Sequence, residues 1–224
     1  MDKKTEETKK EQIQKPFDII SVSPNYFLTS IDLTKFFKGS YIEGNKIVLG
    51  KTFNQDIEGK IRVHEDRVKG WFLDYAKMLI KEKHADFVVL MICVSYLEGI
   101  QQFKEGKSSK RDSGESIKRA LKTIFNIPKD KEWALDTFIK EARHGLFHDG
   151  MTKNNIVLSR GIPSPISIKK GTDNMISINP ILFLWEIEED FKEYINDLKN
   201  PNNKELREKF EKHWNERYPQ LVKS

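Results

Sequence analysis

The sequence predicts a mainly α fold: an up-and-down helical bundle of four to six helices, with a small appended β-hairpin or meander and an irregular N-terminal extension. Three observations predict it. Apolar residues recur at three- and four-residue spacing over much of residues 61–224, as they do on buried helix faces. The pattern changes to short β-branched runs at about residues 153–179. Residues 1–15 are almost entirely polar or charged, which predicts a mobile tail.

The N-terminal extension covers residues 16–60 and mixes short apolar runs with polar ones. Phe17–Val22 and Asn45–Leu49 are predicted to be short strands, and Ile31–Phe37 is predicted to form a helical turn. The helical domain follows over residues 61–224, with the β insertion inside it.

Two helices open the helical domain. The first begins near Val63 and carries an apolar stripe that we expect to face the core: Trp71, Phe72, Tyr75, Met78 and Leu79. The second covers Asp86–Phe103 and ends before Gly106, and its apolar composition predicts a central position in the core.

Helix-capping and helix-breaking residues mark the ends of the next two predicted helices. Ser113 or Ser116 is expected to cap the third helix, which ends before Pro128. The fourth begins at about Lys131 and ends at Asp149-Gly150, where glycine takes the left-handed conformation past the helix end.

The β insertion and two more helices complete the chain. Short β-branched runs at Asn155–Ser159, Ile166–Lys169 and Met175–Ile178 are separated by Pro, Gly and Asp, as in a hairpin or meander. Helices at Ile181–Leu198, after Pro180, and at about Lys204–Arg217 follow.

Net charge, cysteine content and the polar N-terminus limit the functions that the sequence predicts. The formal net charge is +5, from 39 basic and 34 acidic residues, which permits a nucleic-acid partner without requiring one. The single cysteine, Cys93, lies in an apolar run, so we expect a buried thiol and a reducing, cytoplasmic location. The polar N-terminus does not resemble a signal peptide, and we expect no membrane-spanning segment and no membrane partner.

The end of the fourth predicted helix carries the candidate chemistry. It reads Arg143-His144-Gly145-Leu146-Phe147-His148-Asp149-Gly150. His144 and His148 are four residues apart and share a helix face. Arg143 and His148 are five apart, about 140° round an ideal helix. They converge on one ligand only through the length of the arginine, a distorted helix end or a second copy of the chain.

These residue types suffice for RNA cleavage without a metal. Arginine matches a phosphate with a planar, permanently charged fork, and histidine exchanges protons near neutral pH. A helix C-terminus also favours the charged form of His148. The alternative is purely structural, since an arginine and a histidine near a helix end often form a salt bridge and a cap. Spacing alone leaves both open.

The string Arg143-His144-Gly145-Leu146-Phe147-His148 resembles the signature of the HEPN superfamily, in which an arginine and a polar residue precede a histidine on a late helix of a helical bundle. The resemblance covers Val63–Gly150. It implies a metal-independent endoribonuclease without a cofactor, of the kind found in toxin–antitoxin and phage-defence systems. It further implies a homodimer with a composite site. Arg143 and His148 would be catalytic, and His144 would orient or assist them.

The same resemblance leaves a second function open, because many HEPN proteins are non-catalytic modules that bind RNA or a partner protein. An antitoxin or a separate nucleotidyltransferase is a further expected partner. A zinc site at His144 and His148 is a weaker alternative: the spacing fits, but Gly145 stands where a zincin has glutamate.

Other residues have two interpretations each. Glu98 is either an acid supporting Arg143 or His148, or an acid at the solvent edge of its helix. A basic set either follows an RNA backbone or is a solvated surface interleaved with acids: Lys104, Lys107, Lys110, Arg111, Lys118 and Arg119.

The remaining aromatic and histidine residues are predicted to be structural. Trp133, Phe138 and Phe147 are expected in the core rather than stacked on bases. Three histidines in charged surroundings are expected at the surface: His64, His84 and His213.

Overall fold

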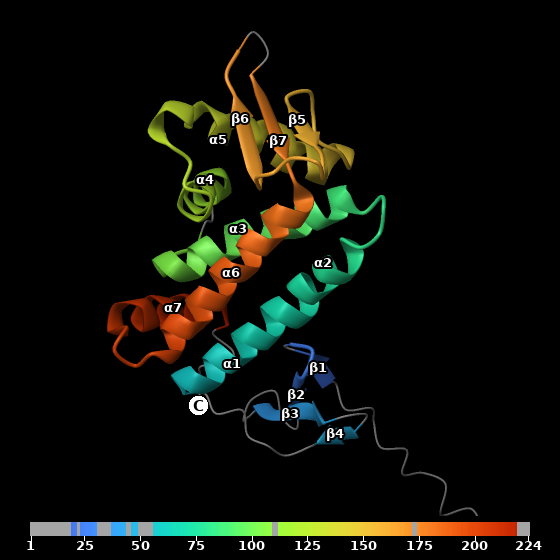
Figure 1. Cartoon of the computed structure of the whole chain (residues 1–224). Coiled ribbons are helices and arrows are strands. Elements are labelled where there is room, and N and C mark those ends of the chain that lie inside the picture. Colours follow the sequence, from blue (N-terminus) through green and yellow to red (C-terminus); the bar gives the residue numbers. More distant parts are fainter. Residues whose placement is uncertain are drawn as a thin grey trace, which may run out of the picture.

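The computed structural model describes residues 19–21, 23–30, 37–43, 46–48, 56–108, 112–171 and 174–218. The chain is mainly helical with two small sheets, as Figure 1 shows, and this confirms the predicted mainly α fold. Helices α3 and α6 run through the middle of the molecule, between a three-stranded sheet at one end and a four-stranded sheet at the other (Figure 1). The predicted tail, residues 1–15, lies outside the described residues.

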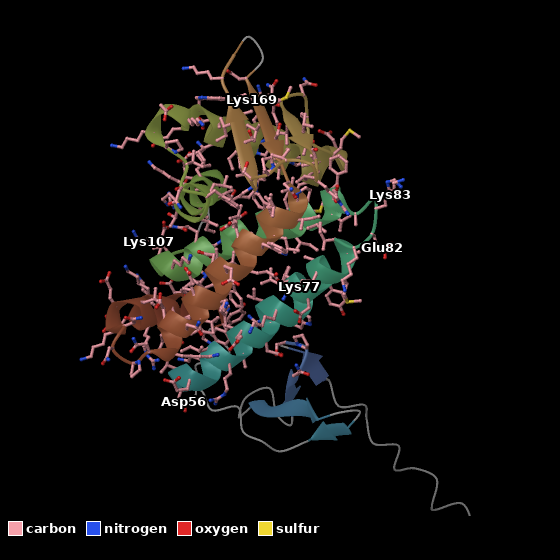
Figure 2. The ribbon with its side chains drawn as sticks, in the orientation of Figure 1. Asp56, Lys77, Glu82, Lys83, Lys107 and Lys169 are labelled. Carbon is pink, nitrogen blue, oxygen red and sulfur yellow. The ribbon has the colours of Figure 1, made fainter. Side chains whose placement is uncertain are left out.

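The first helix is one continuous stretch made of α1 (Ile57–Val68), the π-helical segment η2 (Lys69–Leu73) and α2 (Asp74–Leu79). It begins earlier than predicted, at Asp56, which lies at the start of α1 in Figure 2. The Asp56 carboxylate accepts a hydrogen bond from the Gly59 N–H at 2.7 Å, which caps the free end.

The predicted apolar stripe on this helix is wrong at four of its five residues, since Leu79 packs against the core whereas these four are exposed: Trp71, Phe72, Tyr75 and Met78. A π-helix adds a residue to the turn and so changes which side chains face the core. Val68 packs against the core, the next core residue is Leu73, five positions on, and Ala76 follows at ordinary helical spacing. An uninterrupted 3.6-residue period could not anticipate that change.

Helix α3 (Asp86–Glu105) is central, as predicted, and contacts α4 (Ser113–Ile124), α6 (Pro180–Lys199) and α7 (Lys204–Arg217). It ends at Gly106, which has a left-handed φ of 65°. By length and composition α3 is able to cross a membrane, contrary to the expectation that no segment would be. Its neighbours place it as a core helix, and Cys93 on it is fully buried, so burial raises the pKa of that thiol.

Helix α4 begins after Asp112 rather than being capped by Ser113 or Ser116. The chain then passes through η3 (Lys129–Lys131), α5 (Trp133–Thr137) and two π-helical segments, η4 (Phe138–Arg143) and η5 (Gly145–Asp149). Gly150 ends this stretch at a left-handed φ of 72°, as predicted.

The β insertion forms a three-stranded sheet in the order β5-β7-β6. Strands β6 (Ile166–Lys169) and β7 (Met175–Ile178) form the predicted hairpin, with antiparallel pairing. Strand β5 (Ile156–Leu158) pairs with β7 in parallel, so the insertion is a mixed sheet rather than a meander. Asn179 caps α6 by accepting hydrogen bonds from the N–H groups of Ile181 and Leu182.

The N-terminal extension contains an antiparallel sheet of β1 (Ile19–Ser21), β2 (Tyr26–Ser30), β3 (Phe37–Glu43) and β4 (Lys46–Val48). Strands were predicted around β1 and β4. Of the helical turn predicted at Ile31–Phe37, only Phe37 is described, and it begins β3. The extension meets the helical domain where Asn25 donates hydrogen bonds to Asp66.

The main core lies between α1, α3, α6 and α7. Two predicted surface histidines are part of it: His64 and His213 are each only 3% exposed, and only His84 is exposed as expected. His64 lies on the buried side of α1, and its ring centroid is 4.2 Å from that of Phe103. Charged neighbours in the sequence did not mark an exposed position here: Lys60, one turn before His64, is itself only 6% exposed and pairs with Glu211.

Candidate functional site

The segment that carries the candidate chemistry is π-helical. In a π-helix the hydrogen bonds join residues five apart, so the turn is wider and residues i and i+5 point in more similar directions than they do in an α-helix. Arg143 ends η4 and His148 lies in η5. This winding reduces the angle between Arg143 and His148, which is about 140° in an ideal α-helix. Such distorted turns occur often at functional sites.

Arg143 is held by two other helices. Its Nη2 donates a hydrogen bond to Ser113 Oγ, at the start of α4, at 3.2 Å. The same nitrogen lies 3.8 Å from Glu98 Oε2 on α3. The Arg143 side chain remains 26% exposed, so these contacts do not bury it. Of the interpretations that the sequence left open for Glu98, the structure therefore has it beside Arg143, while Ser113 is a partner that the sequence did not suggest.

Both histidines of the segment are exposed. The ring centroids of His144 and His148 are 6.0 Å apart in an edge-on arrangement. Local burial lowers the pKa of His144, and the nearby charges of Arg143, His148 and Lys153 lower it further. A lowered pKa leaves His144 neutral at neutral pH, a form able to accept a proton.

A metal site is not assembled around these histidines. No group of three or more His, Cys, Asp or Glu side chains is placed to hold an ion within the part of the chain that the structure describes. The adjacent Asp149 pairs instead with Lys153 at 2.8 Å, and that hydrogen bond lowers the pKa of the carboxyl.

The loop after the segment packs directly on Gly145. A β-carbon at Gly145 would lie 2.4 Å from the carbonyl oxygen of Met151. Only glycine permits this approach. In the sequence, Gly145 spoke only against a zincin, although a glycine inside a helix also indicates close packing.

Glu141 fixes the same loop from one turn earlier. Its carboxylate is buried and accepts hydrogen bonds from the backbone N–H of Asn155 at 2.6 Å and from Asn155 Nδ2 at 3.0 Å. The Glu141 carbonyl accepts from the Lys153 N–H at 3.0 Å. Glu141 is therefore a structural acid that sequence reasoning missed, since burial of a carboxylate cannot be read from spacing.

Phe147 lies at the surface rather than in the core, which corrects its predicted position. It is 48% exposed, whereas Leu146 beside it is buried. Its ring centroid is 6.0 Å from the Arg143 guanidinium carbon. Met151, in the following loop, is also exposed. Phe138 is buried as predicted, and Trp133 packs against the core while partly exposed.

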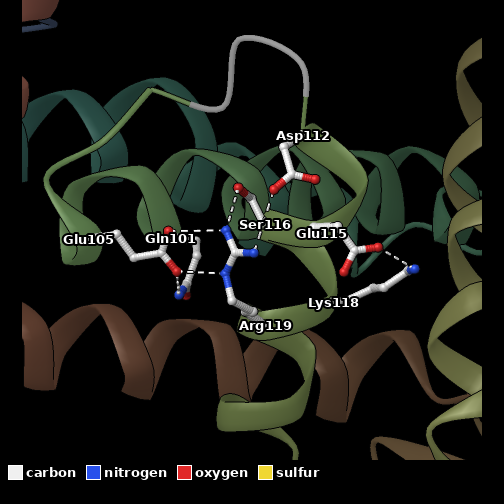
Figure 3. Close-up of polar contacts among 7 residues, drawn as sticks. All are labelled: Gln101, Glu105, Asp112, Glu115, Ser116, Lys118 and Arg119. Atoms are coloured by element: carbon white, nitrogen blue, oxygen red, sulfur yellow. Dashed lines mark hydrogen bonds and ion pairs between the residues drawn. The ribbon is translucent and has the colours of Figure 1, made fainter.

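Three of the four described residues of the predicted basic set are paired with acids. Lys104 Nζ donates to Asp190 at 2.5 Å. Arg119 donates to both Glu105 oxygens at 2.6 and 3.0 Å, as Figure 3 shows.

Lys118 forms ion pairs with Glu115, at 2.5 Å, and with Asp136. Lys107 is exposed beyond the end of α3 (Figure 2), and Lys110 and Arg111 lie outside the described residues. This geometry favours the interpretation of a solvated surface interleaved with acids.

The geometry thus brings together Arg143, His144, His148 and Glu98, with Ser113 and Phe147 added to them. The chain was compared with protein-family models, with curated proteins and with solved structures, and no significant match was found in any of the three.

Proposed function

We propose that this chain is a metal-independent endoribonuclease of the HEPN type, acting as a homodimer. One observation carries the proposal: Arg143 and His148 are both open to solvent on the same π-helical stretch, and Arg143 is held at a fixed place by Ser113 and Glu98. A guanidinium and an imidazole so placed are able to bind and cut a phosphodiester. The up-and-down bundle of such a domain and a cytoplasmic location are part of the same proposal.

The reaction needs two proton transfers and one centre of charge stabilisation. A neutral imidazole accepts the proton of a ribose 2′-hydroxyl, and the 2′-oxygen forms a bond to the adjacent phosphorus. Arg143 stabilises the negative charge that develops on the phosphoryl oxygens. The bond from phosphorus to the 5′-oxygen breaks, and that oxygen takes a proton from an imidazolium. The products are a 2′,3′-cyclic phosphate and a 5′-hydroxyl.

Two copies supply these groups more readily than one. A base and an acid are needed on opposite sides of the phosphorus, and His148 of a second copy meets that need. The exposed ring of Phe147 and the exposed Met151 beside the site are the apolar surface that a second copy would cover. RNA contact is expected at Arg143 first, because Lys104, Lys118 and Arg119 are already paired with acids.

The alternative is a non-catalytic HEPN module that binds RNA or a partner protein, such as an antitoxin or a nucleotidyltransferase. The exposed Phe147 and Met151 also favour this function, since an apolar surface beside a cation suits a protein partner without any chemistry.

A nuclease assay separates the two functions. Purified protein is incubated with mixed RNA in EDTA, beside His148→Ala and a matched control, His84→Ala, which removes an exposed histidine outside the site. The proposal expects cleavage by the wild type and by His84→Ala, 2′,3′-cyclic phosphate ends on the products, and loss of cleavage in His148→Ala.

Equal cleavage by wild type and His148→Ala, or by neither, would contradict the catalytic proposal. A binding module would then be tested by RNA retardation, which His148→Ala should leave intact. Cleavage that needs an added divalent metal would contradict the metal-independent mechanism.

A further inference from the structure

A second region of the molecule has the features of a small-molecule site. A partly enclosed cavity of about 130 Å³ lies between α1, α3 and the end of α7. Its lining includes His64 and Arg67 from α1, Ser95 and Gly99 from α3, and Tyr218. The walls are mostly apolar or aromatic, with few polar groups, which is the usual composition of a ligand pocket.

The α3 wall of the cavity is open at Gly99. A β-carbon built at Gly99 would meet no atom within 4 Å. Glycine in the middle of a helix lowers helix stability by about 0.5–1 kcal/mol relative to alanine. At Gly99 the missing side chain leaves empty volume, unlike at Gly145, where it permits a close backbone contact.

His64 lines this cavity, and neither of its ring nitrogens has a hydrogen-bond partner among the described residues. The imidazole is 3% exposed and lies among aromatic rings, with centroids 4.2 Å away at Phe103 and 5.5 Å away at Phe210. A buried polar group without a hydrogen bond is costly, by about 1–3 kcal/mol. Nearly all buried polar groups in native proteins have a hydrogen-bond partner, either from the protein or from a bound molecule.

The hydrogen-bonding groups of the imidazole indicate what kind of ligand would pair with His64. Burial, together with the nearby charges of Arg67 and His213, lowers the pKa of His64 to about 3, so the ring is neutral at neutral pH. A neutral imidazole offers one donor and one acceptor. Ser95 adds an acceptor, because its hydroxyl already donates to the Met91 carbonyl at 3.0 Å. An uncharged ligand with a hydroxyl matches both groups.

The volume limits the ligand to a single ring. An apolar cavity of about 150 Å³ accommodates benzene. We propose that this cavity binds a small, uncharged, monocyclic aromatic compound bearing one hydroxyl group, which pairs with His64 while its ring packs against the surrounding aromatic side chains. This inference does not rest on the proposed nuclease activity.

Phenol and its isostere toluene are suitable probes. Binding to the full chain is measured by titration with ligand-observed NMR and by thermal unfolding. We expect saturable binding of phenol, about tenfold tighter than that of toluene, a difference of about 1.4 kcal/mol. His64→Phe keeps the aromatic packing but removes both nitrogens, so it should abolish the preference for phenol.

Gly99→Leu should fill the cavity and abolish binding of both probes, while raising the midpoint of thermal unfolding. The matched control is Gly114→Ala in α4, whose added β-carbon makes an ordinary contact, 3.5 Å from Ile139, away from the cavity. It should leave phenol binding unchanged. The proposal is overturned by unsaturable phenol binding, by phenol binding that survives in Gly99→Leu, or by equal affinity for phenol and toluene in the wild type.

Discussion

The backbone of Gly145 faces the carbonyl of Met151 so closely that an added β-carbon would lie 2.4 Å from that oxygen. This contact joins the π-helical segment to the loop that follows it. The position of His148, between the two, therefore depends on a glycine that takes no part in the chemistry. This contact exists only in the folded protein, so its contribution to stability can be measured by unfolding experiments without a substrate.

Gly145→Ala should lower the free energy of unfolding by about 1–3 kcal/mol, because the loop backbone must move to accept the methyl group. Urea denaturation measures the change. Gly114→Ala is the matched control, since its β-carbon has room and alanine favours the helix. Equal stability of the two variants would show that the loop does not rest on Gly145.

Glu141→Ala should destabilise the same loop. The change leaves the buried N–H of Asn155 without its acceptor and should lower the free energy of unfolding by about 1–3 kcal/mol. Asp149→Ala is the comparison, because it removes an exposed ion pair with Lys153, which solvent screens and which therefore contributes little to stability. Urea denaturation of both variants measures the loss of unfolding free energy. A larger loss in Asp149→Ala than in Glu141→Ala would show that Asp149, and not Glu141, holds the loop.

Arg143→Lys tests the site chemistry. Lysine keeps the charge but cannot present two parallel donors to a phosphate, so RNA cleavage should fall about 100-fold. Glu98→Gln should reduce cleavage less, since Glu98 positions Arg143 and is not proposed to touch RNA. The Glu98→Gln substitution should lower kcat and leave KM little changed.

The control for the Arg143 series is Arg160→Lys, which alters an arginine paired with Asp86 outside the site and should cleave normally. Initial rates on a fluorogenic RNA provide the measurement. Wild-type activity in Arg143→Lys would exclude bidentate phosphate recognition.

The buried histidines predict loss of stability in acid. The pKa of His64 is lowered to about 3 in the folded chain, so between about pH 6.5 and 3 the unfolded state binds one more proton than the folded state. The free energy of unfolding should therefore fall as the pH falls, by up to about 1.4 kcal/mol per pH unit. Burial also lowers the pKa of His213, which acts in the same direction.

Urea denaturation between pH 6.5 and 5 isolates the histidines from most carboxylates. His64→Phe should reduce the slope, while His84→Gln, at an exposed position, should leave it unchanged. Identical slopes in His64→Phe and the wild type would mean that His64 does not stay neutral in the folded chain.

Local sequence signals located many elements well. The predicted strands Ile166–Lys169 and Met175–Ile178 have those bounds in the structure, and the glycines expected to end helices, Gly106 and Gly150, both have positive φ. Turn and cap chemistry is a property of a few adjacent residues, so it can be read from the chain. The apolar stripe at Trp71–Met78 failed because η2 adds a residue to one turn.

The candidate site divides in the same way. Its residue types followed from the sequence, whereas the pairing of Glu98 with Arg143 was one of several interpretations that the sequence left open. The supporting contacts of Ser113, Glu141 and Gly145 did not follow from the sequence, because each joins segments whose approach depends on packing. For the same reason, the sequence could not show which residues of the basic set are paired with acids: Lys104 contacts Asp190 only in the folded chain. Catalysis itself stays a prediction.

The sequence by itself determined a mainly helical protein, the bounds of most helices, and an arginine and histidine that stand five residues apart. Only the tertiary structure decided that the segment carrying those two residues is π-helical, that Phe147 lies outside, and that His64 lies inside beside a cavity. Helix formation is governed by residues a few positions apart, whereas the burial of a side chain depends on which distant segments pack against its helix.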